Sequence, residues 1–261
     1  MALFNVPVAE YMSSPVQSVK PDASLPVVQH RMASLGLSSL AVIDGDRLVG
    51  TVSRTDLLAV GQRQTANRGR SPLLVLPNRA VSEVMSPEPI AVDPEHTIAA
   101  AAALMHQYGI HRVFAARGDR ALGVLSTHDL MVATSHVRPE QVIRDWMSAP
   151  VVTIEASLSI ALATRRIENA HVSGLVVVEN NWPVGLFTQI EALECRDLPR
   201  ETAIDEVMNP GMICLPEETR IWRAAQQATA MGARRVIAVK QREMSGILGG
   251  LDFARIVAQA A

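Results

Sequence analysis

Cysteine is scarce in this chain of 261 residues, and neither sign of charge is in large excess. Its 24 basic and 26 acidic residues give a formal charge of −2, which argues against the basic surface of a nucleic-acid-binding protein. Two cysteines, Cys195 and Cys214, are too few for a disulfide framework, so a reducing compartment is expected. Apolar runs such as 98–105 are much shorter than the roughly 20 residues that cross a bilayer, and the first residues do not resemble a secretory signal. We therefore expect a cytoplasmic protein that binds neither nucleic acid nor membrane.

Recognisable catalytic and metal-binding motifs are missing as well. The seven histidines include no His-Glu-x-x-His pair, and no cysteine and histidine share a metal-ligand spacing. The chain also has no Walker loop and no Gly-x-Ser-x-Gly turn. Arg196 follows Cys195 directly, but a plain thiol is the preferred interpretation. We therefore expect no enzyme and no bound metal, and a catalytic domain of unfamiliar type is the last of our hypotheses.

What the chain does contain is an internal repeat. A short phrase that ends in methionine and a polar residue, here called the opening phrase, occurs at residues 8–13, 81–86, 143–148 and 204–209. A proline soon follows each phrase, at Pro15, Pro87, Pro150 and Pro210. Four such phrases, each followed by the same pattern of residues, indicate a repeated fold.

The residues after each opening phrase share a pattern of apolar positions. A short extended stretch, such as residues 90–94, precedes an amphipathic helix. The apolar helix faces are Leu25, Val28, Met32 and Leu35 in the first repeat, Ile98, Ala101, Ala102 and Met105 in the second, and Ile221, Ala224, Ala225 and Ala228 in the fourth. Left-handed helix caps are expected at Gly36, Gly109 and Gly232, where the third repeat has Asn169-Ala170 instead.

Two short apolar strands around a polar turn follow, and a second helix closes each repeat. In the first repeat the turn is Asp44-Gly45-Asp46-Arg47, which is typical of a hairpin. The order predicts an α/β (α+β) fold of four βαββα repeats, at residues 1–61, 78–136, 140–196 and 200–261. Repeats this small bury too little surface to be stable alone, so neighbours are expected to pair. The stretch 61–77 predicts a mobile loop, with a basic binding arm as the alternative.

Each repeat passes from its hairpin to its last helix through one heptapeptide, Gly-x-x-Ser/Thr-x-x-Asp/Glu, here called the closing phrase. It occupies residues 50–56, 123–129, 185–191 and 246–252, and the last copy has Gly249-Gly250 in place of the hydroxyl. A hydroxyl three residues before an acid is a capping box, which needs no ligand. The same helix start can also hold a phosphate on its free amides. The acid could then accept hydrogen bonds from ribose hydroxyls, and the small glycine could leave room for a purine.

The opening and closing phrases together resemble those of cystathionine-β-synthase (CBS) domains. The resemblance covers nearly the whole chain as four copies, similar in layout to the regulatory γ subunit of AMP-activated kinase. It implies that repeats 1 and 2, and repeats 3 and 4, pair pseudo-twofold into two Bateman modules. It also implies clefts between paired repeats that hold adenosine-containing ligands, with the acid of the closing phrase on the ribose.

The resemblance assigns ligand-binding roles residue by residue. The preferred cleft combines residues of the first and second repeats: Leu37, Ser38, His111, Arg112, Val124, Ser126 and Asp129. Within it, His111 and Arg112 are expected near the phosphates and Val124 on the purine. The mirror cleft has Ser53 and Asp56 opposite Ile90 and Ile110, and Asp252 with Arg234 is a fallback. Glu191 fits a capping box better than a ribose site, because its side chain is one methylene longer.

These residues favour a non-catalytic sensor that binds AMP, ADP, ATP or S-adenosylmethionine and changes the orientation of its modules. Its output would pass to an effector protein or to a second copy of the chain, because repeats occupy almost the whole sequence. The alternative is an interaction scaffold with empty clefts, which the irregular third and fourth repeats favour.

Overall fold

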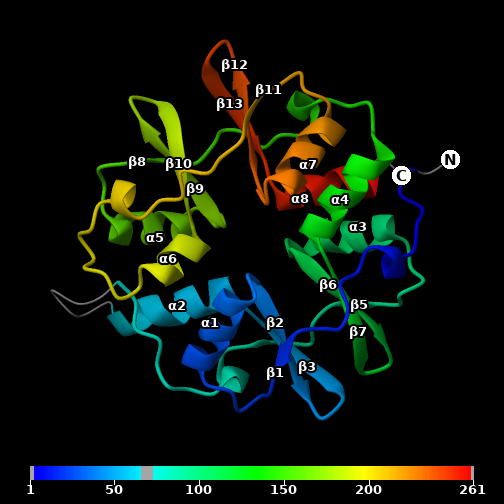
Figure 1. The fold of residues 1–261 in the computed structure, drawn as a ribbon. Helices are drawn as coiled ribbons and strands as arrows, with labels where there is room; N and C mark the ends of the chain where they lie inside the picture. The colour runs from blue at the N-terminus through cyan, green and yellow to red at the C-terminus, as the bar shows by residue number, and fades with distance from the viewer. Residues whose placement is uncertain (1–2, 66–72, 260–261) are drawn as a thin grey trace. The chain divides into compact units, whose positions relative to one another are not determined.

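The computed structural model describes residues 3–65 and 73–259, and it contains the four predicted repeats (Figure 1). Repeat 1 comprises β1 (Ser18–Val19), α1 (Leu25–Ser34), β2 (Ser39–Asp44), β3 (Arg47–Ser53) and α2 (Arg54–Thr65). Repeat 2 comprises β5 (Ala91–Val92), α3 (Ile98–Tyr108), β6 (Arg112–Arg117), β7 (Arg120–Ser126) and α4 (Thr127–Val137). Repeat 3 comprises β8 (Thr153–Glu155), α5 (Ile160–Asn169), β9 (Gly174–Glu179), β10 (Trp182–Thr188) and α6 (Gln189–Glu194). Repeat 4 comprises β11 (Cys214–Pro216), α7 (Ile221–Ala230), β12 (Val236–Lys240), β13 (Glu243–Leu248) and α8 (Gly250–Gln259).

Each repeat forms a small mixed sheet, which confirms the predicted fold class. The first strand runs parallel to the second, and the second and third form an antiparallel hairpin. The predicted hairpin turns carry the positive φ angles that tight turns require. Glycine supplies this angle at Gly45 and Gly118, whereas Asn180-Asn181 and Gln241-Arg242 supply it in the other two repeats.

The predicted helix caps are confirmed, with one correction to a helix face. Gly36, Gly109 and Gly232 have φ angles of 65°, 63° and 64°, as left-handed caps require. Repeat 3 departs from the glycine pattern as expected, and its left-handed residue is His171, with φ of 52°. The apolar face of α1 ends at Met32, because Leu35 lies beyond the helix and is 46% exposed.

The stretch 61–77 is only partly a loop. Residues 61–65 belong to α2, so the prediction was wrong for them. Buried Leu73 and Leu74 donate backbone hydrogen bonds to the carbonyls of Leu198 and Arg196. Residues 66–72 lie outside the described residues. None of the helices that the structure describes is long and apolar enough to cross a membrane.

The chain divides into two compact units, and each unit combines two repeats that are not consecutive. Unit 1 contains Met1–Val16, Ile90–Val151 and Met212–Ala261, and therefore repeats 2 and 4. Unit 2 contains Gln17–Pro89 and Val152–Gly211, and therefore repeats 1 and 3. The expected modules pair repeats that lie in different units, so that pairing stays a prediction.

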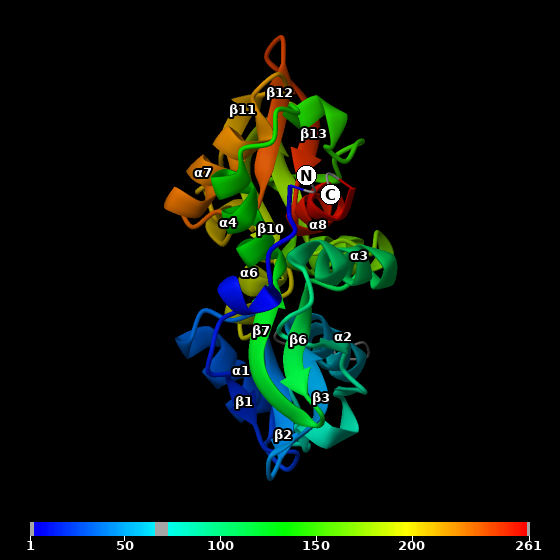
Figure 2. The same cartoon turned by 90° about the vertical axis from the view of Figure 1, so that its right-hand side faces the viewer.

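Helices join the two repeats of unit 1. Helix α3 packs against α8, and α4 packs against both α7 and α8 (Figures 1 and 2). The contacting faces are rich in buried alanine, including Ala101, Ala133, Ala224 and Ala254. Small side chains allow helix axes to approach closely, which brings the ends of these helices together.

A single apolar core joins the two repeats of unit 2. Helix α2 packs against α1 and α6, and α6 packs against α5. Leu25, Met32 and Leu57 of repeat 1 share this core with Ile160 and Phe187 of repeat 3. The shared core supplies the burial that neither repeat has alone.

The opening phrases form single 3-10 turns that pack on the repeat that follows or precedes them. The turns are η1 (Val8–Glu10), η2 (Val81–Glu83), η3 (Ile143–Asp145) and η4 (Ile204–Glu206). Ser13 pairs with Val124 of repeat 2, and β4 (Ser86–Pro87) pairs with β3 of repeat 1. Ser148 pairs with Ile247 of repeat 4, and Asn209 pairs with Leu186 of repeat 3. Repeats 1 and 2 thus exchange their opening phrases, as do repeats 3 and 4.

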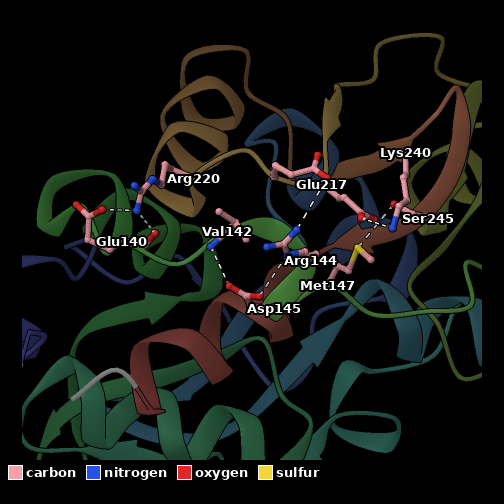
Figure 3. A network of polar contacts seen from close by, with 10 residues as sticks. Glu140, Val142, Arg144, Asp145, Met147, Glu217, Arg220, Lys240 and Ser245 are labelled. Carbon is pink, nitrogen blue, oxygen red and sulfur yellow. Dashed lines mark hydrogen bonds and ion pairs between the residues drawn. The ribbon is translucent and has the colours of Figure 1, made fainter.

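Figure 3 shows one of these exchanges, in which residues 140–147 lie on repeat 4. Glu140 pairs with Arg220 at the start of α7, and Arg144 lies 4.0 Å from Glu218. The Ser245 hydroxyl lies 4.0 Å from the Met147 sulfur. Both ion pairs are exposed, so they contribute little to stability.

Candidate functional site

The closing phrases of repeats 1 and 2 form the capping boxes that their sequence predicts. Asp56 Oδ2 accepts hydrogen bonds from the backbone N–H and the hydroxyl of Ser53, both at 2.7 Å. Asp129 Oδ2 accepts the same pair of bonds from Ser126, also at 2.7 Å. The hydroxyls and acids of these phrases therefore hold the starts of α2 and α4 in place.

Capping leaves half of each carboxylate available. The second oxygen, Oδ1, of Asp56 and of Asp129 makes no hydrogen bond within the described part of the chain. Both residues are half-buried, so solvent and solutes reach them. An ionised carboxylate accepts through both oxygens. Capping and ribose binding are therefore compatible at Asp56 and Asp129, and do not exclude one another.

Repeats 3 and 4 hold their acids more tightly. Glu191 caps α6 through bonds from the N–H and hydroxyl of Thr188, and its side chain is buried. In repeat 4, Asp252 Oδ2 accepts the Gly249 N–H at 2.7 Å, and Asp252 Oδ1 accepts the Ser148 hydroxyl at 2.7 Å. Burial raises the pKa of Asp252, and the hydrogen bonds from Gly249 and Ser148 oppose that shift. Asp252 is thus less available to a ligand than Asp56 or Asp129.

In unit 1 the starts of α4 and α8 meet. A Cβ added at Gly250, the first residue of α8, would lie 2.5 Å from Thr127 Oγ1 and 3.1 Å from His111 Nδ1. Only glycine leaves room for this approach, which explains Gly250 in the irregular Gly249-Gly250 pair. Each helix of this length carries a partial positive charge at its N-terminus. Two such charges therefore lie side by side.

Basic side chains lie near His111, next to the same point. The His111 carbonyl accepts the N–H of Thr127 at 2.9 Å, which places His111 beside the start of α4. Desolvation lowers the pKa of His111 to about 4, and the charges of Arg112, Arg235 and Arg234 act in the same direction. His111 is nevertheless an exposed residue that keeps contact with solvent. The three neighbouring cations lower its pKa in addition to the effect of desolvation. We call His111, Arg112, Arg234 and Arg235 the basic cluster.

The equivalent positions of unit 2 are neutral. Positions are equivalent when they lie opposite the capping residue of the closing phrase in the hairpin. Arg112 lies opposite Ser126 in this way, Ser39 opposite Ser53, and Gly174 opposite Thr188. The residues before Ser39 and Gly174 are Ser38 and Ser173. Cationic side chains at these positions therefore occur in unit 1 and not in unit 2.

The predicted site residues fall into two groups. Unit 1 holds His111, Arg112, Val124, Ser126, Asp129, Ile90, Ile110, Arg234 and Asp252, and unit 2 holds Leu37, Ser38, Ser53 and Asp56. The structure brings the basic cluster, Ser126 and Asp129 to one end of α4. Leu37 packs against the core of unit 2, and Ile90 and Ile110 pack against that of repeat 2. Each expected cleft draws on both units, so its assembly stays a prediction.

The glycine that begins each closing phrase has a different role from the one proposed for it. A Cβ at Gly123 would lie 2.4 Å from the Met12 sulfur, and one at Gly246 would lie 2.4 Å from the Met147 sulfur. Gly50 and Gly185 contact Met85 and Met208 in the same way. The space beside these glycines holds the methionine of an exchanged opening phrase and not a purine. The repeated methionine and the repeated glycine are therefore two sides of one contact.

Two relevant residues were not selected from the sequence. Arg235 stands next to Arg234, and only the meeting of repeats 2 and 4 shows that both lie near His111. Ser148 belongs to an opening phrase, and its bond to Asp252 spans 104 positions. Among the described residues, no group of three or more histidine, cysteine, aspartate or glutamate side chains could hold a metal ion.

Comparison with known protein families identifies the family of this chain. The family model for the CBS domain matches residues 8–62, 81–136 and 143–196. The chain belongs to the CBS domain family. Repeat 4 has the same βαββα order, so the structure contains four CBS repeats in the part of the chain that it describes.

Solved structures share the fold of this chain over nearly its whole length. Protein MJ1225 from Methanocaldococcus jannaschii, described as a candidate archaeal homologue of g-AMPK, has a TM-score of 0.84 and 16% identity, with 96% of this chain and 99% of that chain covered. An uncharacterised conserved protein from Pyrococcus horikoshii has a TM-score of 0.69 and 14% identity, with 97% and 100% covered. At these identities the likeness shows the fold.

Curated relatives carry no described activity. Uncharacterised protein MJ1404 from Methanocaldococcus jannaschii is 23% identical, over 98% of this chain and 63% of its own length. The chain spans 58% to 63% of the length of the curated relatives that it matches. CBS proteins that consist of these repeats are usually not catalytic.

Proposed function

We propose that this CBS-domain protein is a non-catalytic sensor that binds adenosine-containing ligands and passes the signal to another protein or to a second copy of itself. The observation that carries the proposal is the basic cluster at the meeting point of α4 and α8, next to a carboxylate with a free oxygen. The cluster offers phosphate recognition, and Asp129 Oδ1 offers ribose recognition two residues into the same helix.

Like charges at one point favour an anionic ligand. Two helix starts and the positive guanidinium groups of Arg112, Arg234 and Arg235 repel one another in the free protein, whereas His111 is neutral near pH 7. A phosphate would relieve that repulsion, and each hydrogen bond to a charged group contributes about 1.5–3 kcal/mol. AMP, ADP and ATP therefore suit unit 1 better than S-adenosylmethionine, whose sulfonium is cationic.

The location of the cluster also suggests how binding is signalled. His111 and Arg112 belong to repeat 2, whereas Arg234 and Arg235 belong to repeat 4. A phosphate held by both pairs would favour the arrangement in which the starts of α4 and α8 are closest. Ligands shift an equilibrium only when they bind one arrangement more tightly than another. This dependence on two repeats supplies such a difference.

The alternative is a scaffold with empty clefts. Buried Glu191 and the doubly bonded Asp252 favour it for repeats 3 and 4. Both hypotheses leave catalysis out, since no residue has been assigned a chemical step.

Titration calorimetry distinguishes the two functions. Adenosine, AMP, ADP, ATP and S-adenosylmethionine are titrated into the native protein and into a variant with Arg234→Ala and Arg235→Ala. The sensor predicts that the phosphate-bearing ligands bind and that the variant weakens them at least tenfold while adenosine is little affected. Absence of heat with all five ligands supports the scaffold and contradicts the sensor.

A further inference from the structure

Asp252 differs from the other closing acids in the origin of its hydrogen bonds. In repeats 1, 2 and 3 one carboxylate oxygen takes both the N–H and the hydroxyl of the capping residue. Gly249 has no hydroxyl, so it supplies only its N–H to Asp252 Oδ2, at 2.7 Å. The missing hydroxyl comes from Ser148, and it goes to the other oxygen, Oδ1, at 2.7 Å.

Ser148 covers Asp252 from the solvent side. Asp252 is buried, with 9% of its surface exposed, whereas Ser148 is an exposed residue of the exchanged opening phrase. The corresponding serine of the first opening phrase, Ser13, makes only backbone hydrogen bonds with Val124 in the described part of the chain. The hydroxyl-to-carboxylate contact is therefore particular to repeat 4 and does not come with the exchange itself.

Arg255 completes the enclosure. Its Nη2 lies 3.7 Å from Asp252 Oδ1, and it also donates to the carbonyl of Trp146 in the same opening phrase. Its guanidinium lies 5.5 Å from the centre of the Trp146 ring. Arg255 Nε is buried and has no hydrogen-bond partner among the described groups. A buried donor without a partner is costly, so the surroundings of Asp252 keep a capacity to recognise an oxygen that the protein itself does not supply.

We propose that Ser148 makes the hydrogen bond that a ribose hydroxyl would make, and thereby closes repeat 4 to adenosine-containing ligands. A serine hydroxyl and a ribose hydroxyl donate to a carboxylate in the same way. The inference rests on the proposed function in that it takes the closing acids as ribose acceptors. It adds that Ser148 sets which of them are open: Asp56 and Asp129 keep a free oxygen, and Asp252 does not.

The test rebuilds the arrangement of repeat 2 in repeat 4. Ser148→Ala removes the covering hydroxyl, and Gly249→Ser restores a hydroxyl at the capping position. Position 249 accepts a side chain, because an added Cβ would contact only Asp252 Oδ2, at 3.6 Å. The stoichiometry of AMP binding is measured by titration calorimetry and equilibrium dialysis on the native protein, the double variant and a Ser13→Ala control.

The double variant is expected to bind one more AMP per chain than the native protein, and Ser13→Ala is expected to bind the native number. An unchanged stoichiometry in a double variant with native circular dichroism overturns the proposal. If Asp129→Ala still weakens AMP binding in that case, the proposed sensor function stands without the role of Ser148. If neither protein binds AMP, the sensor function and the closure of repeat 4 both fail.

Discussion

Replacing Asp129 by alanine removes two kinds of interaction that can be measured separately. One carboxylate oxygen caps α4 through Ser126, and the other is free to accept a ligand. Loss of a helix cap costs about 0.5–2 kcal/mol of stability. In a protein of this size each kcal/mol lowers the melting temperature by about 2–4 °C. Asp129→Ala is therefore expected to melt several degrees below the native protein without any ligand.

The same change is also expected to weaken nucleotide binding to the folded protein, independently of the loss of stability. A hydrogen bond to a charged group contributes about 1.5–3 kcal/mol, which corresponds to about a ten- to hundredfold change in Kd. The dissociation constant for AMP is measured by titration calorimetry at a temperature where both proteins are folded.

Asp252→Ala is the matched control. It also removes a cap acceptor at the start of a ten-residue helix, but its carboxylate is already occupied by Gly249 and Ser148. It should lower the melting temperature and leave the affinity for AMP nearly native. If Asp129→Ala is destabilised yet binds AMP as tightly as the native protein, capping is the whole role of Asp129. Equal losses of affinity in both variants would refute the distinction between the two carboxylates.

Three further outcomes follow from the geometry. Gly246→Ala is expected to cost about 1–3 kcal/mol in thermal or denaturant unfolding, because its Cβ would lie 2.4 Å from the Met147 sulfur; Gly249→Ala, which has room, serves as the control, and a native-like Gly246→Ala would contradict the contact. The pKa of His111 is about 4, and a bound phosphate would raise it. The affinity for ATP should therefore rise between pH 7 and pH 5 by more in the native protein than in His111→Gln. Identical pH profiles of the two proteins would show that His111 is not part of the site. Burial raises the pKa of Cys195 to about 12, so this thiol should react with Ellman's reagent at pH 8 only after unfolding, and rapid labelling of Cys195 in the folded protein would contradict its burial.

The sequence predicted the elements well because their signals are local. Apolar spacing located α3 and α7, and glycine located the caps at Gly109 and Gly232. Repetition strengthened each signal, since four copies of a weak pattern are more informative than one. The third helix cap was missed because His171, unlike glycine, rarely adopts a left-handed conformation.

The rest depended on which surfaces meet, and no local pattern encodes that. The contact of α3 with α8 joins repeats that the sequence could not pair, and it places Arg234 near His111. The exchange of opening phrases explains why methionine and glycine recur together, although the sequence gives each a separate interpretation. Ser148 and Asp252 are likewise unremarkable until the exchange brings them into contact.

The exchanged opening phrases also affect how the chain can be made and divided. Strand β3 of repeat 1 has only β2 as a neighbour until β4, at residues 86–87, has been synthesised. Buried Phe4 and Val8 lack their packing partners until repeat 2 has emerged from the ribosome. Folding during translation is therefore delayed by a whole repeat. Cutting the gene at the sequence boundaries of one repeat would leave that piece without the opening phrase that packs on it, so the smallest fragment with a complete exchange holds two consecutive repeats.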